Sequence, residues 1–201
     1  VQVEHYIVST GLRQMILGSE IAGYVDGVWG CEFVERVAKP GYLSSGGQLS
    51  LQRDEQVISQ IGYVIDNTTK TRAVFEINKG ANKIKEIDVN AAIAQEDRRV
   101  PFQNMIYIAD GPSDVPVFSV INQYGGKTFA VYKKGCQEEF SQVNELQKQG
   151  RIQSFGEANY TEGTQTYMWI LNAMSETGNR IVHDRSQVLG TQVGQPPEPI
   201  I

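Results

Sequence analysis

A short apolar run at residues 105–109 stops abruptly at Asp110, and a Gly-Pro turn with a second carboxylate, Asp114, follows it. An apolar run of this length, bounded by turn residues, is typical of a buried parallel strand. In open α/β sheets, ligands bind just outside the carboxyl ends of the strands. Two aspartates there can supply the hard oxygen ligands that Mg²⁺ prefers. The segment predicts a parallel sheet and a cation site; the alternative is an ordinary turn with two solvated aspartates.

The rest of the chain alternates short apolar runs with helical patterns. Strands are expected at residues 6–8, 29–34, 62–65, 105–109 and 128–132. Helices are expected at residues 12–19, 70–78, 115–123, 138–149 and from 164 to 173 and beyond, with a possible short helix at 89–95. This order predicts an α/β fold, a Rossmann-like three-layer α/β/α arrangement with one mostly parallel sheet and right-handed crossovers.

The chain has 201 residues, of which 40% are apolar, so it can bury one good core. We expect that core to span residues 1–183. Residues 184–201, which include a Pro-Pro-Glu-Pro stretch, are expected to form a flexible tail. Residues 38–51 are rich in Gly, Ser and Pro and predict a surface loop or hairpin, which could serve in specificity or in dimer contact.

The composition excludes several classes of function. The net charge of −5 argues against nucleic acid or an anionic membrane as partner, and no apolar run is long enough to span a bilayer. The two cysteines lie far apart without metal-ligand spacing, which favours free thiols in a reducing cytoplasm. The only histidines, His5 and His183, leave little material for a zinc site or a Ser-His-Asp triad.

Two further segments carry groups that suit an anion. Ser9, Thr10 and Gly11 follow the first apolar run and precede a helical pattern, where a hydroxyl and backbone N–H groups can bind an anion; the alternative is a plain helix N-cap. Lys70 falls in the first turn of the next helix, where a cation lies unfavourably at the positive end of the helix dipole. This position indicates that Lys70 binds an anion; the alternative is a solvated lysine. Lys79 competes for this role, but at a helix C-terminus a lysine needs no functional explanation.

Hydroxyl, lysine and carboxylates together are the groups that phosphoryl transfer requires. Residues 6–11, 70–75 and 108–114 resemble the second, third and fourth motifs of the haloacid dehalogenase superfamily, and most closely its phosphoserine phosphatase-like branch. The last segment reads Ala-Asp-Gly-Pro-Ser-Asp where that branch has Gly-Asp-Gly-x-x-Asp. The resemblance extends over roughly residues 5–182 and implies the partly complete core of that superfamily.

The resemblance implies a Mg²⁺-dependent phosphatase that acts through an aspartyl-phosphate on a small phosphorylated metabolite. Ser9 and Lys70 would act in catalysis, the first as a hydrogen-bond donor to the phosphoryl group and the second by neutralising charge. By this resemblance, the phosphate would be bound by Ser9, Thr10, Gly11 and Lys70. Mg²⁺ would be coordinated, directly or through water, by Asp110 and Asp114, and these ligands would be supported by Gly111 and Ser113.

The nucleophile of that family lies in an Asp-x-Asp motif on the central strand, and this chain contains no Asp-x-Asp pair. We therefore expect the nucleophile and the usual cap upstream in a longer parent protein. Loss of a central strand would leave unpaired strand edges, which predicts association with the missing segment, rearrangement or a homodimer. The alternative is a non-catalytic phosphate- and metal-binding module, or pseudo-phosphatase. A dehydrogenase-like nucleotide fold is disfavoured because no Gly-x-Gly-x-x-Gly follows a strand.

Overall fold

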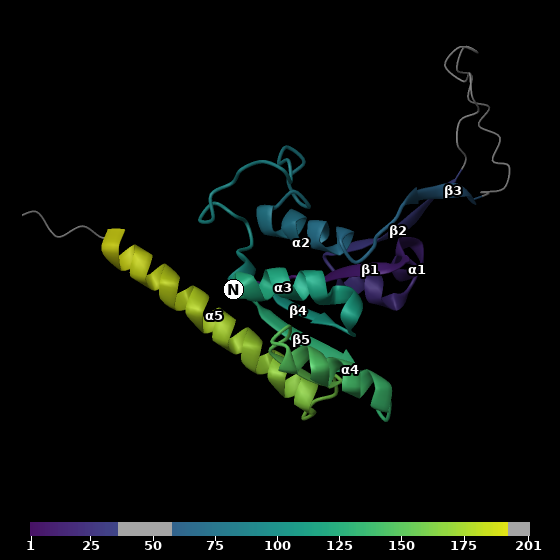
Figure 1. Cartoon of the computed structure of the whole chain (residues 1–201). Coiled ribbons are helices and arrows are strands. Elements are labelled where there is room, and N and C mark those ends of the chain that lie inside the picture. The colour runs from purple at the N-terminus through teal and green to yellow at the C-terminus, as the bar shows by residue number, and fades with distance from the viewer. Residues whose placement is uncertain (36–57, 193–201) are drawn as a thin grey trace, which may run out of the picture. The chain divides into compact units, whose positions relative to one another are not determined.

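The computed structural model describes residues 1–35 and 58–192, which form an α/β protein with two small sheets (Figure 1). The chain divides into two compact units, and each is described by itself. One unit is Glu4–Ala73, and the other comprises Val1–Val3 and Val74–Ile201. The loop predicted at residues 38–51 lies outside the described residues.

The sheet of the Glu4–Ala73 unit contains three strands in the order β1-β2-β3. Its elements are β1 (Tyr6–Leu12), α1 (Arg13–Leu17), the 3₁₀ helix η1 (Glu20–Tyr24), β2 (Gly27–Glu35) and β3 (Ile58–Tyr63). The pairing of β1 with β2 is parallel, and that of β2 with β3 is antiparallel. The register passes from Val8↔Trp29 to Leu12↔Cys31, so residues 9–11 form an irregularity in the strand. The predicted strands at 6–8 and 29–34 are confirmed, and each is longer than its apolar run.

Helix α2 (Thr69–Lys79) has the two end signals that its sequence predicts. The Asp66 carboxylate accepts the backbone N–H groups of Thr68 and Thr69 at 2.8 and 2.7 Å, which satisfies donors that a helix N-terminus leaves open. At the other end, Gly80 takes a left-handed conformation with φ of 90° and donates its N–H to the Glu76 carbonyl. The expected helix at 70–78 is confirmed, and the division between the two units falls within it.

The second unit contains an all-parallel three-stranded sheet in the order β4-β5-β6 with helices interleaved along the chain. Its strands are β4 (Ile106–Ala109), β5 (Lys127–Tyr132) and β6 (Ser154–Glu157). Its helices are η3 (Phe102–Asn104), η4 (Pro112–Asp114), α3 (Val115–Gln123), α4 (Gln137–Lys148) and α5 (Gln165–Gln192). The strands at 105–109 and 128–132 and the helices at 115–123 and 138–149 were predicted and are confirmed to within a residue or two.

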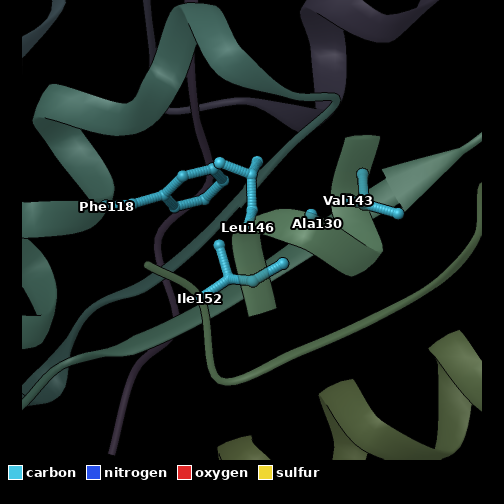
Figure 2. Close-up of a cluster of buried hydrophobic side chains, with 5 residues drawn as sticks. All are labelled: Phe118, Ala130, Val143, Leu146 and Ile152. Atoms are coloured by element: carbon cyan, nitrogen blue, oxygen red, sulfur yellow. The ribbon is translucent and has the colours of Figure 1, made fainter. Parts of the chain in front are cut away.

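Helices pack on both faces of this sheet. One face carries a cluster of buried side chains from α3, β5, α4 and the segment before β6 (Figure 2). Its members are Phe118, Ala130, Val143, Leu146 and Ile152. Successive strand residues point to opposite faces. Phe129 accordingly contacts the other layer, where its ring lies 4.6 Å from that of Trp169 in α5.

Three expectations from the sequence differ from the structure. One mostly parallel sheet was expected, but the described strands form two separate sheets of three strands each. No described strand links β1 of the first sheet to β4 of the second. The possible helix at 89–95 is wrong, since that stretch forms turns and bends. Residues 184–192, assigned to the flexible tail, continue helix α5, because no proline interrupts the helical backbone there. Among the described residues, no helix has both the length and the apolar character needed to cross a membrane.

Gly126, between α3 and β5, is expected to tolerate no side chain. A Cβ atom there would lie 2.6 Å from the Phe102 carbonyl oxygen and 2.6 Å from Cγ2 of Ile121. We expect Gly126→Ala to lower the free energy of unfolding by about 1–3 kcal/mol through overpacking, measured by urea denaturation. In Gly178→Ala, within α5, a Cβ would meet no atom within 4 Å, so this control should gain up to about 1 kcal/mol from helix propensity. Equal effects in both variants would contradict the packing argument.

Candidate functional site

The segment Ser9-Thr10-Gly11 lies in the irregular end of β1, not at a helix N-terminus as its sequence predicts. Helix α1 begins only at Arg13 and has no side-chain cap. The Ser9 hydroxyl oxygen accepts the Gly11 backbone N–H at 3.0 Å. A hydroxyl that accepts one hydrogen bond still carries its own donor proton. Ser9 can therefore still donate to an anion, whereas the Gly11 N–H is already engaged.

Cys31 of β2 joins this segment to the approach of helix α2. Its thiol donates to the Thr10 carbonyl oxygen at 3.2 Å, and its sulfur accepts the Ile65 backbone N–H at 3.3 Å. Ile65 immediately precedes Asp66, the residue that caps α2. One side chain thus contacts Thr10 and the residue that leads into the cap of α2. The sequence analysis treated Cys31 only as a free thiol, which it is, and nothing in its spacing indicated this bridging position.

The structure distinguishes the two candidate lysines. Lys79 donates its ammonium group to the carbonyl oxygens of Val89 and Ala91 at 2.6 and 2.7 Å. It therefore secures the irregular stretch that follows α2, as expected for a lysine at a helix C-terminus. Lys70 lies in the first turn of the helix with only 6% of its surface exposed. The contacts of Lys79 give it a structural role, so Lys70 remains the candidate for the phosphate role that the sequence predicts.

The cap at the start of α2 predicts a pH dependence of stability. Hydrogen bonds from the backbone N–H and the hydroxyl of Thr69, the largest contributions, lower the pKa of the exposed Asp66 carboxyl. A group whose folded-state pKa lies below the unfolded value stabilises the fold above the unfolded pKa, near 3.9 for aspartate, and loses this effect as the pH falls through the folded pKa. We expect wild type to be more stable than Asp66→Ala at neutral pH and this difference to shrink below about pH 4. Urea denaturation across this range is the measurement.

Asp66→Asn is the matched control for this prediction. An asparagine side chain also caps helices but does not titrate in this range. Its stability relative to that of Asp66→Ala should therefore stay constant with pH. A wild-type profile parallel to that of Asp66→Asn down to pH values well below the ordinary aspartate pKa would contradict the assignment.

The predicted metal side lies at the carboxyl end of β4. Asp110 directly follows the strand and is exposed. Asp114, at the end of the 3₁₀ turn η4, is only 2% exposed. Its two carboxylate oxygens accept separate hydroxyl donors: Oδ1 accepts the Tyr107 hydroxyl at 2.5 Å and Oδ2 accepts the Ser113 hydroxyl at 2.8 Å. The Asp114 backbone N–H donates to the Gly111 carbonyl at 3.0 Å and closes the turn.

Tyr107 is a residue of this site that the sequence analysis missed. Burial raises the pKa of its hydroxyl above the ordinary value, and the Asp114 carboxylate raises it further by its charge and by accepting the hydrogen bond. The hydroxyl therefore stays protonated and available as a donor. A signal was present in the sequence, because a tyrosine within a buried apolar strand needs a partner for its hydroxyl. The sequence did not show which acceptor it meets.

The donor chemistry at this turn suits Mg²⁺ at one position. Asp110 offers an exposed carboxylate, a hard oxygen ligand of the kind that Mg²⁺ takes. No group of three or more potential ligands from Asp, Glu, His or Cys occurs within residues 1–35 and 58–192. A complete metal site therefore requires ligands beyond those that the described residues gather. Ser9 and Lys70 belong to one unit, and Asp110 and Asp114 belong to the other. The surroundings of each pair are therefore described separately.

No protein-family model matches this chain, and no solved structure matches it. A protein of Borreliella burgdorferi (strain ATCC 35210 / DSM 4680 / CIP 102532 / B31), described as uncharacterized, is 40% identical to it over 173 residues. The matched region covers 85% of this chain and 57% of that protein. The chain thus spans little more than half the length of this relative.

Proposed function

We propose that this chain is part of a Mg²⁺-dependent phosphomonoester hydrolase of the haloacid dehalogenase type, with a Rossmann-like core. It acts on a small phosphorylated metabolite, through an aspartyl-phosphate whose aspartate lies outside this chain. The observation that carries the proposal is the strand order. Among the described strands, β1 pairs only with β2 and β4 only with β5, so both strands that lead into the predicted site segments are edge strands.

Open strand edges are costly in a parallel sheet, which is normally covered on both faces and paired through its centre. A further parallel strand can pair with the edge of β1 or of β4 that no described strand pairs with. In the superfamily that the sequence resembles, the strand that carries the nucleophile is the central one. The length of the Borreliella relative, of which this chain matches 57%, is consistent with such a segment in that protein.

Each side chain has a role in this proposal that follows from its own chemistry. The Ser9 hydroxyl accepts the Gly11 N–H and directs its proton to a phosphoryl oxygen. The Lys70 ammonium neutralises charge on the phosphoryl group, as donors aimed at developing charge do. Asp110 would hold Mg²⁺, which supplies charge neutralisation and a template for the phosphate. Gly111 and Ser113 shape the turn behind it.

Two activity measurements test the proposal, one on the chain itself and one on a longer protein with and without the change Asp110→Asn. The chain itself should hydrolyse no p-nitrophenyl phosphate above the buffer rate, because no nucleophilic aspartate is present in an Asp-x-Asp pair. A longer protein that joins this chain to the proposed nucleophile segment should turn over the substrate only with Mg²⁺ and lose at least about 100-fold of that activity in Asp110→Asn. Turnover by the chain alone, or an unchanged Mg²⁺ response in Asp110→Asn, would contradict the proposal.

A non-catalytic phosphate- and metal-binding module is the second candidate. The observation that favours it over a hydrolase is the absence of an Asp-x-Asp pair from the sequence. This candidate predicts that the upstream residues also lack Asp-x-Asp and that the longer protein binds inorganic phosphate without hydrolysing phosphomonoesters. Determining the sequence upstream of Val1 separates the two candidates.

A further inference from the structure

We propose that helix α5 is an interaction surface that pairs, in antiparallel orientation, with α5 of a second copy of this chain. This inference goes beyond the proposed function, because the helix contains none of the candidate site residues. The surface concerned is the side of α5 that faces away from the sheet of its own unit.

The other side of α5 packs on that sheet. Ala173 and Thr177 are buried there, and the Trp169 ring lies against a ring of β5. Thr177 is the last buried residue of the helix among those whose side chains are described, and every residue from 182 to 189 is exposed. In Figure 1 the C-terminal end of α5 lies away from β5 and α4. Residues 182–189 therefore extend the helix beyond the part that packs on its own unit.

An exposed line of residues at the heptad spacing of a coiled coil runs along the outer side of α5 from residue 168 to residue 189. Four of its seven positions hold large apolar side chains that are between 46% and 62% exposed: Met168, Leu171, Val182 and Leu189. The other three are Ser175, Gly178 and Arg185. A line of this spacing over three heptads is typical of a helix that packs against another helix.

Two such lines match in size when the helices run antiparallel and the pair is centred on residue 180. In this register Leu171 of one copy faces Leu189 of the other, so apolar surface meets apolar surface at both ends of the contact. Val182 of one copy faces Gly178 of the other. A side-chain carbon at Gly178 would have open space around it, so the branched valine has room there.

Charge selects this orientation and makes a second copy the matching occupant. Arg185 is the one charged residue of the seven. In a parallel pair it would face its own counterpart, and like charges in contact oppose association. In the antiparallel register it faces Ser175, whose hydroxyl oxygen can accept a hydrogen bond from the guanidinium. The two copies of Arg185 then lie about 15 Å apart along the helix axis, which exceeds the screening length of about 8 Å.

The experiment is sedimentation velocity of the purified chain over a range of concentrations, which gives the Kd of the dimer. We expect the wild-type chain to dimerise in the micromolar range. Val182→Glu should raise the Kd by at least about 100-fold, because it places a charge without a partner in the contact. Glutamate has a higher helix propensity than valine, so α5 itself should persist, and far-UV circular dichroism checks this.

Gln187→Glu is the matched control. It adds the same charge to the same helix at an exposed position outside the heptad line, so the Kd should stay within a few-fold of wild type.

Substitutions at Ser175 test the orientation and do not depend on Val182→Glu. In the antiparallel pair Ser175 faces Arg185, so Ser175→Glu should lower the Kd by about 2- to 5-fold and Ser175→Lys should raise it by a similar factor. In a parallel pair Ser175 would face its own counterpart, so both changes would raise the Kd.

Three results would overturn the inference. A wild-type chain that stays monomeric throughout the micromolar range would reject the pairing; if Val182→Glu then lowered its thermal midpoint more than Gln187→Glu does, another part of the same chain would cover this side of α5. A dimer that tolerates Val182→Glu as well as Gln187→Glu would place the contact on a different surface. A rise in Kd for both Ser175 variants would reject the antiparallel orientation.

Discussion

Replacement of Phe118 by alanine is expected to lower the free energy of unfolding by about 3–5 kcal/mol. Phe118 is fully buried and lies in the cluster between α3, β5 and α4 (Figure 2). Truncation removes its transfer free energy and leaves a cavity that rigid neighbours fill only in part. The loss is large compared with the total stability of a typical domain, about 5–15 kcal/mol. Urea denaturation followed by circular dichroism is the measurement.

Tyr24→Ala is the control for this prediction, because the side chain of Tyr24 is 78% exposed. Its effect should stay within about 0.5 kcal/mol, as is usual for surface substitutions. Comparable losses in the two variants would contradict the placement of Phe118 in the core. Phe118 also contacts the Tyr107 ring, so its removal should loosen the packing of β4 as well as the core.

Replacement of Lys70 by methionine is expected to reduce kcat/KM for p-nitrophenyl phosphate by at least about 100-fold in the longer, nucleophile-containing protein that the proposed function requires. The change keeps most of the side-chain volume and removes the charge. In the proposed function, Lys70 stabilises charge on the transferring phosphoryl group, and loss of one such group typically has an effect of this size. A steady-state assay at saturating Mg²⁺ is the measurement.

Lys79→Met is the matched control, since Lys79 lies in the same helix and donates to the Val89 and Ala91 carbonyls. It should lower stability, because two carbonyl oxygens lose a charged donor, but it should keep kcat/KM within a few-fold of wild type. The reverse order, with activity lost in Lys79→Met and kept in Lys70→Met, would assign the phosphate role to Lys79.

The elements that the sequence predicted well are those with local signals. Helix α3 was predicted at residues 115–123 and is found there, because Pro116 suits only the first turn and apolar side chains recur at helical spacing. Helix α2 likewise has an aspartate cap at Asp66 and a glycine end at Gly80. Each of these signals acts within a few residues of the place where it stands in the chain.

The pairing of strands from distant segments could not be predicted from the sequence as well as these local features. Strand β6 has only four residues, one of them Gly156, and shows no alternating pattern, so it was not predicted. Its place next to β5 is a parallel pairing between distant segments, in which Phe129 is opposite Ser154 and Ala130 is opposite Phe155. The division into two sheets is also a property of pairing, which the periodicity of single segments does not contain.

The candidate site shows the same limit. Ser9, Lys70 and Asp110 were predicted from residue type and place in the chain, and the structure describes the surroundings of each. Cys31 and Tyr107 contact partners that lie 21 and 7 residues away, so no local pattern indicated which partners they meet. The burial of Asp114 could not be predicted either, because it depends on hydroxyl donors that make an enclosed carboxylate tolerable.

The bond between Tyr107 and Asp114 has a consequence for the entropy of binding. Ordering a flexible loop around a ligand costs conformational freedom, and this cost is subtracted from the affinity. Here the turn is already ordered by the hydroxyl donors of Asp114 and by its backbone bond to Gly111, so that cost is met when the unit folds. In the proposed function, a cation that binds at Asp110 would therefore not have to order this turn.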